Sequence, residues 1–359
     1  MSSSAAKTLT REGLAALIEE LVAAQIEVVA PALIGPHTQA TAYRPIRNLE
    51  EAQPEPFIPS RSLKEYFLPP EETLFRFQQQ KQEIRLEEGM AVAQPRVILF
   101  ARPCDAAALE IVDQVMDWDY RDEPWFTRRQ ATVIIGLACQ GGDSSCFCSA
   151  VGLSPDNGRG SDILLIPMGN DFAVEAQTEK GQEFLRLHPS QFGDGASAET
   201  VTESRRILPV HAAERQLPRT ETLQAWLDGH FSSDLWSRIA WKCHGCGACA
   251  SVCPTCHCFD IVDEMEGPCS GSRRRHWDTC QTCKFTLHAS GHNPRQDQNS
   301  RIRQRLMHKF FIYPARFGKI LCTGCGRCSR ACPGGMDLLE ILWQAEEAAA
   351  QGKTREGTP

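Results

Sequence analysis

The sequence contains no apolar run long enough to span a membrane, and its first residues, MSSSAAKTLTREGL, lack the apolar segment of a signal peptide. It also lacks a P-loop, a nucleophile elbow and an adjacent pair of cysteines. Two glycine-containing stretches, GRGSD at 158 and GDGAS at 193, neither follow a predicted strand nor open a predicted helix. These absences argue against a membrane protein and against a nucleotide-binding or serine-hydrolase chain.

Cysteine, by contrast, is abundant, with 17 residues in a chain of 359. Disulfide-rich secreted scaffolds are short, whereas grouped cysteines in a chain of this length predict cluster or metal ligands in a reducing compartment. The length allows two domains, and a hydrophobic content of 42% suffices for ordinary cores. We therefore expect a cytoplasmic protein of two domains.

Two segments share the spacing C-x2-C-x2-C-x3-C-P, namely CHGCGACASVCP from Cys243 and CTGCGRCSRACP from Cys322. In bacterial two-cluster ferredoxins with this spacing, each [4Fe-4S] cluster is held by three cysteines of one motif and the last cysteine of the other. Zinc needs only two C-x2-C pairs, so two complete quartets favour iron and sulfur over a pair of zinc sites. We predict two [4Fe-4S] clusters, one held by Cys243, Cys246, Cys249 and Cys332, and the other by Cys322, Cys325, Cys328 and Cys253.

Four further cysteines lie in the N-terminal half, near the predicted ends of two buried strands. VILFA at 97 and ATVIIGLA at 131 read as strands separated by a helix that Asp105 could cap, which is the order of a parallel α/β sheet. Ligands of such sheets gather beyond the carboxyl ends of the strands. We therefore expect a third Fe-S cluster at Cys104, Cys139, Cys146 and Cys148. Four buried packing residues, or a zinc site, are the alternatives.

The predicted architecture is an α/β N-terminal domain over 1–220 with a parallel or mixed sheet, followed by a C-terminal α+β ferredoxin-like dicluster domain over 221–345. The second domain carries a basic insertion at 255–320, and 346–359 reads as a charged flexible tail. Periodicity and turn residues predict further elements: a helix over 11–25 capped by Thr10, strands over 73–78 and 82–88, a hairpin across Gly169 and Asn170, a helix from Lys180, loops over 190–222 and a helix over 222–240.

The insertion between the motifs contains a rival set of thiols. Cys280 and Cys283 form a C-x2-C pair, and with Cys256 and Cys258 they could hold a metal, although such residues more often line a cluster pocket.

The same insertion is strongly basic. Eleven Lys and Arg face two Asp between Cys269 and Lys319, a local balance of +9 that leaves -16 for the rest of the chain. The run Arg273 to Arg275 could bind nucleic acid or form a salt-bridged face. We favour a third interpretation, in which the run favours the reduced form of a cluster and attracts an acidic partner, because stacking aromatic residues are not interleaved with it.

The combination of motifs resembles one family. RPCD at 102, ACQGGDSSCFC ending at Cys148, CHGCGACASVCPTCHC, WDTC at 277, GHNPR at 291 and CTGCGRC together resemble the β subunit of sulfhydrogenases, which are cytoplasmic NAD(P)-linked [NiFe]-hydrogenases. They are also similar to one subunit of anaerobic sulfite reductase. The N-terminal four cysteines fall on the family's cysteine positions, as do Cys256, Cys258 and Cys280, whereas Cys269 and Cys283 do not.

The resemblance implies an electron-transfer subunit placed between a flavin subunit that handles NAD(P)H and a catalytic subunit of hydrogenase or siroheme reductase type. On this interpretation the chain has no catalytic residue of its own, and it binds neither nucleic acid nor membrane. Two alternatives stay open: a nucleic-acid-binding protein with structural clusters, and a self-contained reductase with one incompletely ligated cluster.

Overall fold

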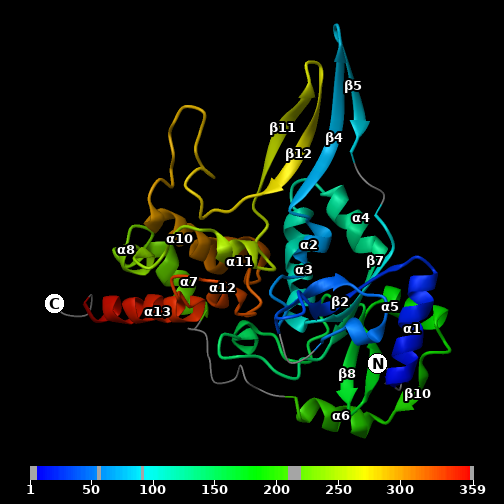
Figure 1. Cartoon of the computed structure of the whole chain (residues 1–359). Helices are drawn as coiled ribbons and strands as arrows, with labels where there is room; N and C mark the ends of the chain where they lie inside the picture. Colours follow the sequence, from blue (N-terminus) through cyan, green and yellow to red (C-terminus); the bar gives the residue numbers. More distant parts are fainter. Residues whose placement is uncertain (1–5, 55–57, 90–92, 209–219, 356–359) are drawn as a thin grey trace. The chain divides into compact units, whose positions relative to one another are not determined.

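The structure is a computed structural model that describes residues 6–54, 58–89, 93–208 and 220–355 (Figure 1). The chain divides into two compact units, which are described separately below. The first unit comprises Met1–Phe67, Ala93–Gln216 and Cys322–Cys325. The second comprises Leu68–Val92, Leu217–Leu321 and Gly326–Pro359.

The first unit is built on a sheet of eight strands in the order β10-β1-β9-β8-β7-β6-β2-β3. The pairs β2/β6, β6/β7 and β7/β8 are parallel and the remaining pairs are antiparallel, so the predicted parallel or mixed sheet is confirmed as a mixed one. The strands are β1 (Ala6–Leu9), β2 (Glu27–Leu33), β3 (Thr41–Pro45), β6 (Arg96–Ala101), β7 (Thr132–Leu137), β8 (Ile163–Met168), β9 (Asp171–Ala176) and β10 (Gly193–Ala196).

Helices pack on this sheet through apolar side chains. In α1, Leu14, Leu17 and Ile18 are buried, and Thr10 caps the helix as predicted by accepting a hydrogen bond from the Gly13 amide. The region predicted as loops over 190–222 instead contains β10 and α6, and its residues 209–219 lie outside the described part. The helices are α1 (Arg11–Ala23), η1 (Leu49–Glu51), α2 (Lys64–Phe67), α3 (Pro103–Met116), α4 (Glu123–Ala131), η2 (Cys148–Val151), α5 (Glu179–Leu187) and α6 (Ala198–Arg206).

Helix α3 begins earlier than the sequence suggests. Arg102 occupies the N-cap position and Pro103 opens the helix, a position that suits proline because its missing N–H has no intrahelical partner there. The prediction that Asp105 caps the helix is therefore wrong, and the buried Asp105 carboxylate instead accepts a hydrogen bond from the Tyr43 hydroxyl at 2.8 Å. As a result, Cys104 lies in the first turn of α3 beyond the end of β6.

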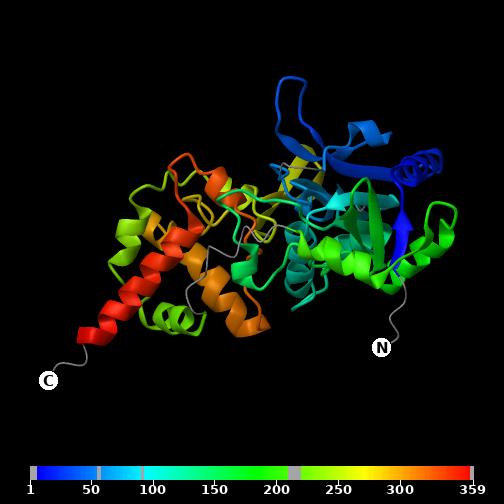
Figure 2. The same cartoon turned by 90° about the horizontal axis from the view of Figure 1, so that it is seen from below.

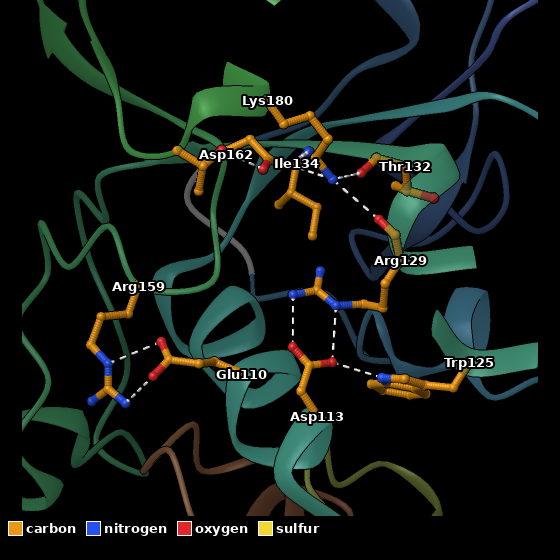
Figure 3. A network of polar contacts seen from close by, with 10 residues as sticks. Glu110, Asp113, Trp125, Arg129, Thr132, Ile134, Arg159, Asp162 and Lys180 are labelled. Carbon is orange, nitrogen blue, oxygen red and sulfur yellow. Dashed lines mark hydrogen bonds and ion pairs between the residues drawn. The ribbon is translucent and has the colours of Figure 1, made fainter. Parts of the chain in front are cut away.

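A buried carboxylate links three elements of the first unit (Figure 3). Asp162 accepts hydrogen bonds from the Ile134 amide at 2.9 Å and the Thr178 hydroxyl at 2.7 Å, and the Lys180 ammonium lies 3.1 Å from it. We expect Asp162→Ala to lower the free energy of unfolding of the first unit by about 3 kcal/mol, because it leaves buried donors without their acceptor. Denaturant unfolding followed by tryptophan fluorescence measures this change.

The matched control for this substitution is Glu110→Ala. Glu110 forms a bidentate pair with Arg159 in the same network, but both side chains are more than a third exposed (Figure 3). Exposed pairs contribute about 0–1 kcal/mol, so this variant should unfold close to wild type. Equal losses in the two variants would contradict a structural role for the Asp162 carboxylate.

The second unit combines a four-stranded sheet with a group of helices. Its sheet has the order β11-β12-β4-β5 and is antiparallel throughout. Its strands are β4 (Glu71–Gln80), β5 (Glu83–Glu88), β11 (Phe259–Gly267) and β12 (Ser270–Trp277). The strands predicted over 73–78 and 82–88 are present, but they pair with the insertion between the cysteine motifs rather than with the first sheet.

The helices of the second unit pack against one another close to the two cysteine motifs. Helix α10 packs against α8, and α13, the red helix in Figure 2, packs against α7 and α8. The helix predicted over 222–240 is divided into α7 and α8, and the predicted tail is helical as far as Arg355. The helices are α7 (Thr220–Gly229), α8 (Leu235–Ala240), α9 (Ala248–Ser251), α10 (Gln298–Met307), the π-helical turn η3 (His308–Ile312), α11 (Tyr313–Phe317), α12 (Arg327–Arg330) and α13 (Leu338–Arg355).

In the described part of the chain, every helix is too short or too polar to cross a lipid bilayer.

Candidate metal centres

One cavity of the second unit collects cysteines from both ferredoxin motifs. We call it the ferredoxin-motif cavity. The first motif and the last cysteine of the second motif contribute four thiols that the spacing assigns to one cluster, and Cys328 also lines the cavity. Its walls include Cys243, Cys246, Cys249, Cys332, Cys328 and Arg305. The structure thus brings together one complete set of predicted ligands from segments more than 80 positions apart.

The two motifs have the same local conformation. Gly247 and Gly326 each adopt a left-handed backbone conformation at the N-cap of a short helix, α9 or α12, which turns the cysteine loop back on itself. Ahead of each helix, a backbone amide donates to the first thiol of the motif at 3.4 Å. In the first motif, the Gln298 side-chain amide also donates to Cys243 Sγ at 3.1 Å. Such donors stabilise sulfur that carries negative charge.

A buried guanidinium tests whether the ferredoxin-motif cavity suits an anionic group. Arg305 is only 7% exposed, and within the described part of the chain its Nε and Nη2 have no hydrogen-bond partner. Burying a cation without partners is costly, so this arrangement requires negative charge nearby. An Fe-S cluster with four thiolate ligands carries that charge, and the donor set therefore fits the predicted cofactor.

The predicted ligands of the second cluster are divided between the two units. Cys253 and Cys328 belong to the second unit, whereas Cys322 and Cys325 belong to the first. Cys253 is buried, and the ammonium of Lys309 donates to its Sγ at 3.4 Å. A hydrogen bond from the neighbouring Cys256 thiol lowers the pKa of Cys253, and burial opposes this effect.

A second cavity lies in the first unit and is lined by all four N-terminal cysteines. We call it the N-terminal cavity. Cys104 comes from the first turn of α3, Cys139 follows β7, and Cys146 and Cys148 lie at the start of η2, as the expected edge of the sheet requires. The buried Arg102 guanidinium donates to Cys139 Sγ at 3.4 Å. A positive charge at this distance from sulfur is compatible with thiolate ligands of a cluster.

One thiol of the N-terminal cavity favours its protonated, neutral form. Burial, together with negative charge on Cys139 and Cys146, raises the pKa of the Cys148 thiol to about 11. A cation or a metal centre is needed to hold several thiolates at such a site, because ligand binding by cysteine displaces the proton.

The N-terminal cavity is closed on one side by the second ferredoxin motif. Gly324 and Cys325 line it, the Phe147 amide donates to the Gly324 carbonyl at 2.8 Å, and the Cys146 thiol lies 3.9 Å from the Cys325 carbonyl. A Cβ atom at Gly324 would lie 2.5 Å from the Phe147 backbone. The thiols of the N-terminal cavity and a predicted ligand of a ferredoxin cluster are therefore neighbours within the first unit.

The rival thiol set of the insertion is arranged as pairs. The Cys256 thiol contacts Cys253, and the Cys258 thiol donates to Cys280, which raises the pKa of Cys258 and lowers that of Cys280 to about 6. Cys283 is exposed, as is Cys269. Within the ranges that the structure describes, no three His, Cys, Asp or Glu side chains are grouped for a single metal ion.

The basic run on β12 is a salt-bridged face. Cross-strand carboxylates bind all three arginines: Arg273 pairs with Asp263, Arg274 with Glu71 and Glu264, and Arg275 with Glu72. The favoured interpretation, that this run supplies free positive charge to a cluster, is therefore wrong for these residues. Strand pairing places each arginine opposite or diagonal to an acidic residue, a pattern that only the sheet register reveals.

The cations that face the thiols are instead Arg102, Arg305 and Lys309. Spacing along the chain does not distinguish them from the other basic residues, since their burial depends on tertiary packing. The available signal was the i, i+4 spacing of Arg305 and Lys309 on one helical face.

Comparison with known proteins supports the assignment of the second half of the chain. Residues 242–336 match the family model of the 4Fe-4S dicluster domain, which confirms the predicted dicluster domain. The chain is also similar to Sulfhydrogenase 2 subunit beta of Pyrococcus furiosus, with 31% identity over 289 residues that cover 79% of this chain and 82% of that protein. The similarity thus extends well beyond the cysteine motifs into the first unit.

Proposed function

The chain belongs to the sulfhydrogenase β-subunit family, and from this premise we propose that it is the iron-sulfur electron-transfer subunit of a multi-subunit oxidoreductase. Its role is to relay electrons between a flavin subunit that handles NAD(P)H and a catalytic subunit of hydrogenase or sulfur/sulfite reductase type. The bond-making chemistry then belongs to the partner chain, and this chain supplies ligands and a protein environment for the redox groups.

We assign the ligands of two [4Fe-4S] clusters to the eight ferredoxin-motif cysteines. Bound clusters of this type accept and donate single electrons. The chain's own residues supply the thiolates, the amide donors to sulfur and the buried cations that offset the negative charge. The assignment is Cys243, Cys246, Cys249 and Cys332 for one cluster, and Cys322, Cys325, Cys328 and Cys253 for the other.

The observation that carries this proposal is the ferredoxin-motif cavity. Cys332 comes from the second motif and lines the same cavity as the first three cysteines of the first motif. The exchange of the last cysteine between motifs is the feature that distinguishes a two-cluster ferredoxin from two independent zinc loops. The unpartnered Arg305 donors at this cavity support an anionic occupant.

We assign a third Fe-S cluster to the N-terminal cavity, held by Cys104, Cys139, Cys146 and Cys148. Its closeness to the peptide of Cys325 supports a route for electrons between this site and the second ferredoxin motif. The first unit would then extend the electron path beyond the dicluster domain.

Co-purification under anaerobic conditions tests this function. We expect the full chain, expressed with its neighbouring redox subunits, to co-purify with two partners, a flavin subunit plus a catalytic one, and NAD(P)H to reduce its clusters only when the flavin subunit is present. Turnover of a substrate by the isolated chain with an artificial donor would favour the self-contained reductase. Salt-dependent binding of DNA or RNA by the isolated chain would favour the nucleic-acid alternative.

A further inference from the structure

We propose that Arg305 and Lys309 raise the reduction potentials of the ferredoxin clusters and are positioning residues of the electron path. This inference rests on the proposed function, because it needs clusters at the ferredoxin-motif cysteines. It adds the residues that tune those clusters, which neither the cysteine spacing nor the basic run on β12 identifies.

Both cations belong to one helical face next to the thiols. Arg305 lies in the last turn of α10, and Lys309 follows four positions later in the π-helical turn η3. Residues four apart point to the same side of a helix, and π turns often occur at functional sites. Both side chains are buried, with Arg305 7% exposed and Lys309 2% exposed.

Arg305 is held among thiols. Its strongest electrostatic partners are Cys249, Cys328, Cys256 and Cys253. Cys249 is a predicted ligand of one ferredoxin cluster, while Cys253 and Cys328 are predicted ligands of the other. A single guanidinium in the second unit therefore faces ligands of both predicted clusters.

Lys309 is anchored by oxygen atoms at the same place. Its Nζ donates to the Thr255 hydroxyl and to the Leu321 carbonyl, both at 2.9 Å, and to Cys253 Sγ at 3.4 Å. The two neutral oxygens fix the ammonium position but leave its charge directed at sulfur. Lys309 should therefore act mainly on the cluster held by Cys253.

The direction of the effect follows from charge balance. Reduction adds one negative charge to a cluster, so a nearby fixed cation stabilises the reduced form more than the oxidised form. The attraction is stronger in a buried site than in water because the local dielectric constant is lower. Arginine keeps its charge at all accessible pH values. Removing it should therefore lower the reduction potential.

The test is an anaerobic redox titration of the full chain followed by electron paramagnetic resonance. We expect Arg305→Gln to keep its clusters and to lower the ratio of reduced to oxidised cluster at a fixed potential by at least about tenfold, equivalent to about 59 mV for one electron. Arg305→Lys keeps the charge and should stay within about threefold of wild type. The control is Arg303→Gln on the same helix, whose guanidinium donates to the Phe231 carbonyl away from the thiols and which should titrate like wild type.

A second charge-removing variant covers the case in which Arg305→Gln does not load its clusters. Lys309→Gln retains an amide that can donate to Thr255 and Leu321 while losing the charge, and we expect it to lower the ratio for one of the two clusters. Loaded clusters with unchanged titrations in the charge-removing variants would overturn this inference and leave the proposed function standing. A wild-type chain without iron and sulfide would overturn both.

Discussion

Cys325→Ser is expected to cost the protein one ferredoxin cluster, or convert it to a three-iron form, and to reduce electron flow from NAD(P)H to the terminal acceptor to background. Cys325 is buried, and a serine hydroxyl is a poor replacement for a thiolate on iron. Iron content should fall by about one to four atoms per chain, as measured on the anaerobic complex. Coupled turnover is measured in the same preparation.

Cys269→Ser provides the control for this substitution. Cys269 is exposed and lies outside both motifs at the turn between β11 and β12. Its replacement should leave iron content and coupled turnover at wild-type values. If Cys325→Ser behaved like Cys269→Ser, the assignment of Cys325 as a cluster ligand would be wrong.

Gly324→Ala should disturb the N-terminal site although it changes none of its cysteines. Gly324 has φ of +62°, and an added Cβ would lie 2.5 Å from the backbone of Phe147 and 2.6 Å from Cys148 Cα. The segment that carries Cys146 and Cys148 must therefore move. We expect loss of the third cluster, seen as about four fewer iron atoms, or a several-fold slower electron transfer between that site and the dicluster domain.

Gly318→Ala separates this effect from backbone strain. Gly318 has φ of +67°, but no atom lies within 4 Å of the position that an added Cβ would take. Both variants carry the cost of a left-handed alanine, about 1 kcal/mol, and should show a similar part of their loss in stability. An unchanged N-terminal site in Gly324→Ala would contradict a role for the contact between this glycine and the Phe147 loop.

The fold is predictable from the sequence where signals are local. The buried runs that became β6 and β7 and the hairpin of β8 and β9 follow from apolar runs and turn residues, and Thr10 caps α1 as a side-chain acceptor should. The start of α3 was misplaced because Asp105 resembles a cap, whereas Pro103 opens the helix.

Long-range pairing was not accessible in this way. The predicted strands that became β4 and β5 show alternation, but nothing in their residues indicates that they pair with β12. The same pairing neutralises the arginines of β12 through Glu71 and Glu72. Charge counting along the chain therefore assigned to the insertion a free positive charge that the sheet largely cancels.

The candidate site divides in a similar manner. Cysteine spacing predicts which thiols share a cluster, because the cube imposes short and regular gaps on its ligands. The cations near those thiols cannot be predicted from spacing, since Arg305 and Lys309 are selected by burial and by the helical face that α10 turns inward. Side-chain placement is thus required to find the groups that tune the clusters.

The most direct test of the account is the metal and sulfide content of the anaerobically prepared full chain. If paired cysteine quartets hold iron-sulfur clusters, the protein should be brown and contain about eight iron and eight sulfide per chain, or about twelve of each with the third cluster, and little zinc. A colourless protein with stoichiometric zinc and neither iron nor sulfide would contradict the electron-transfer role.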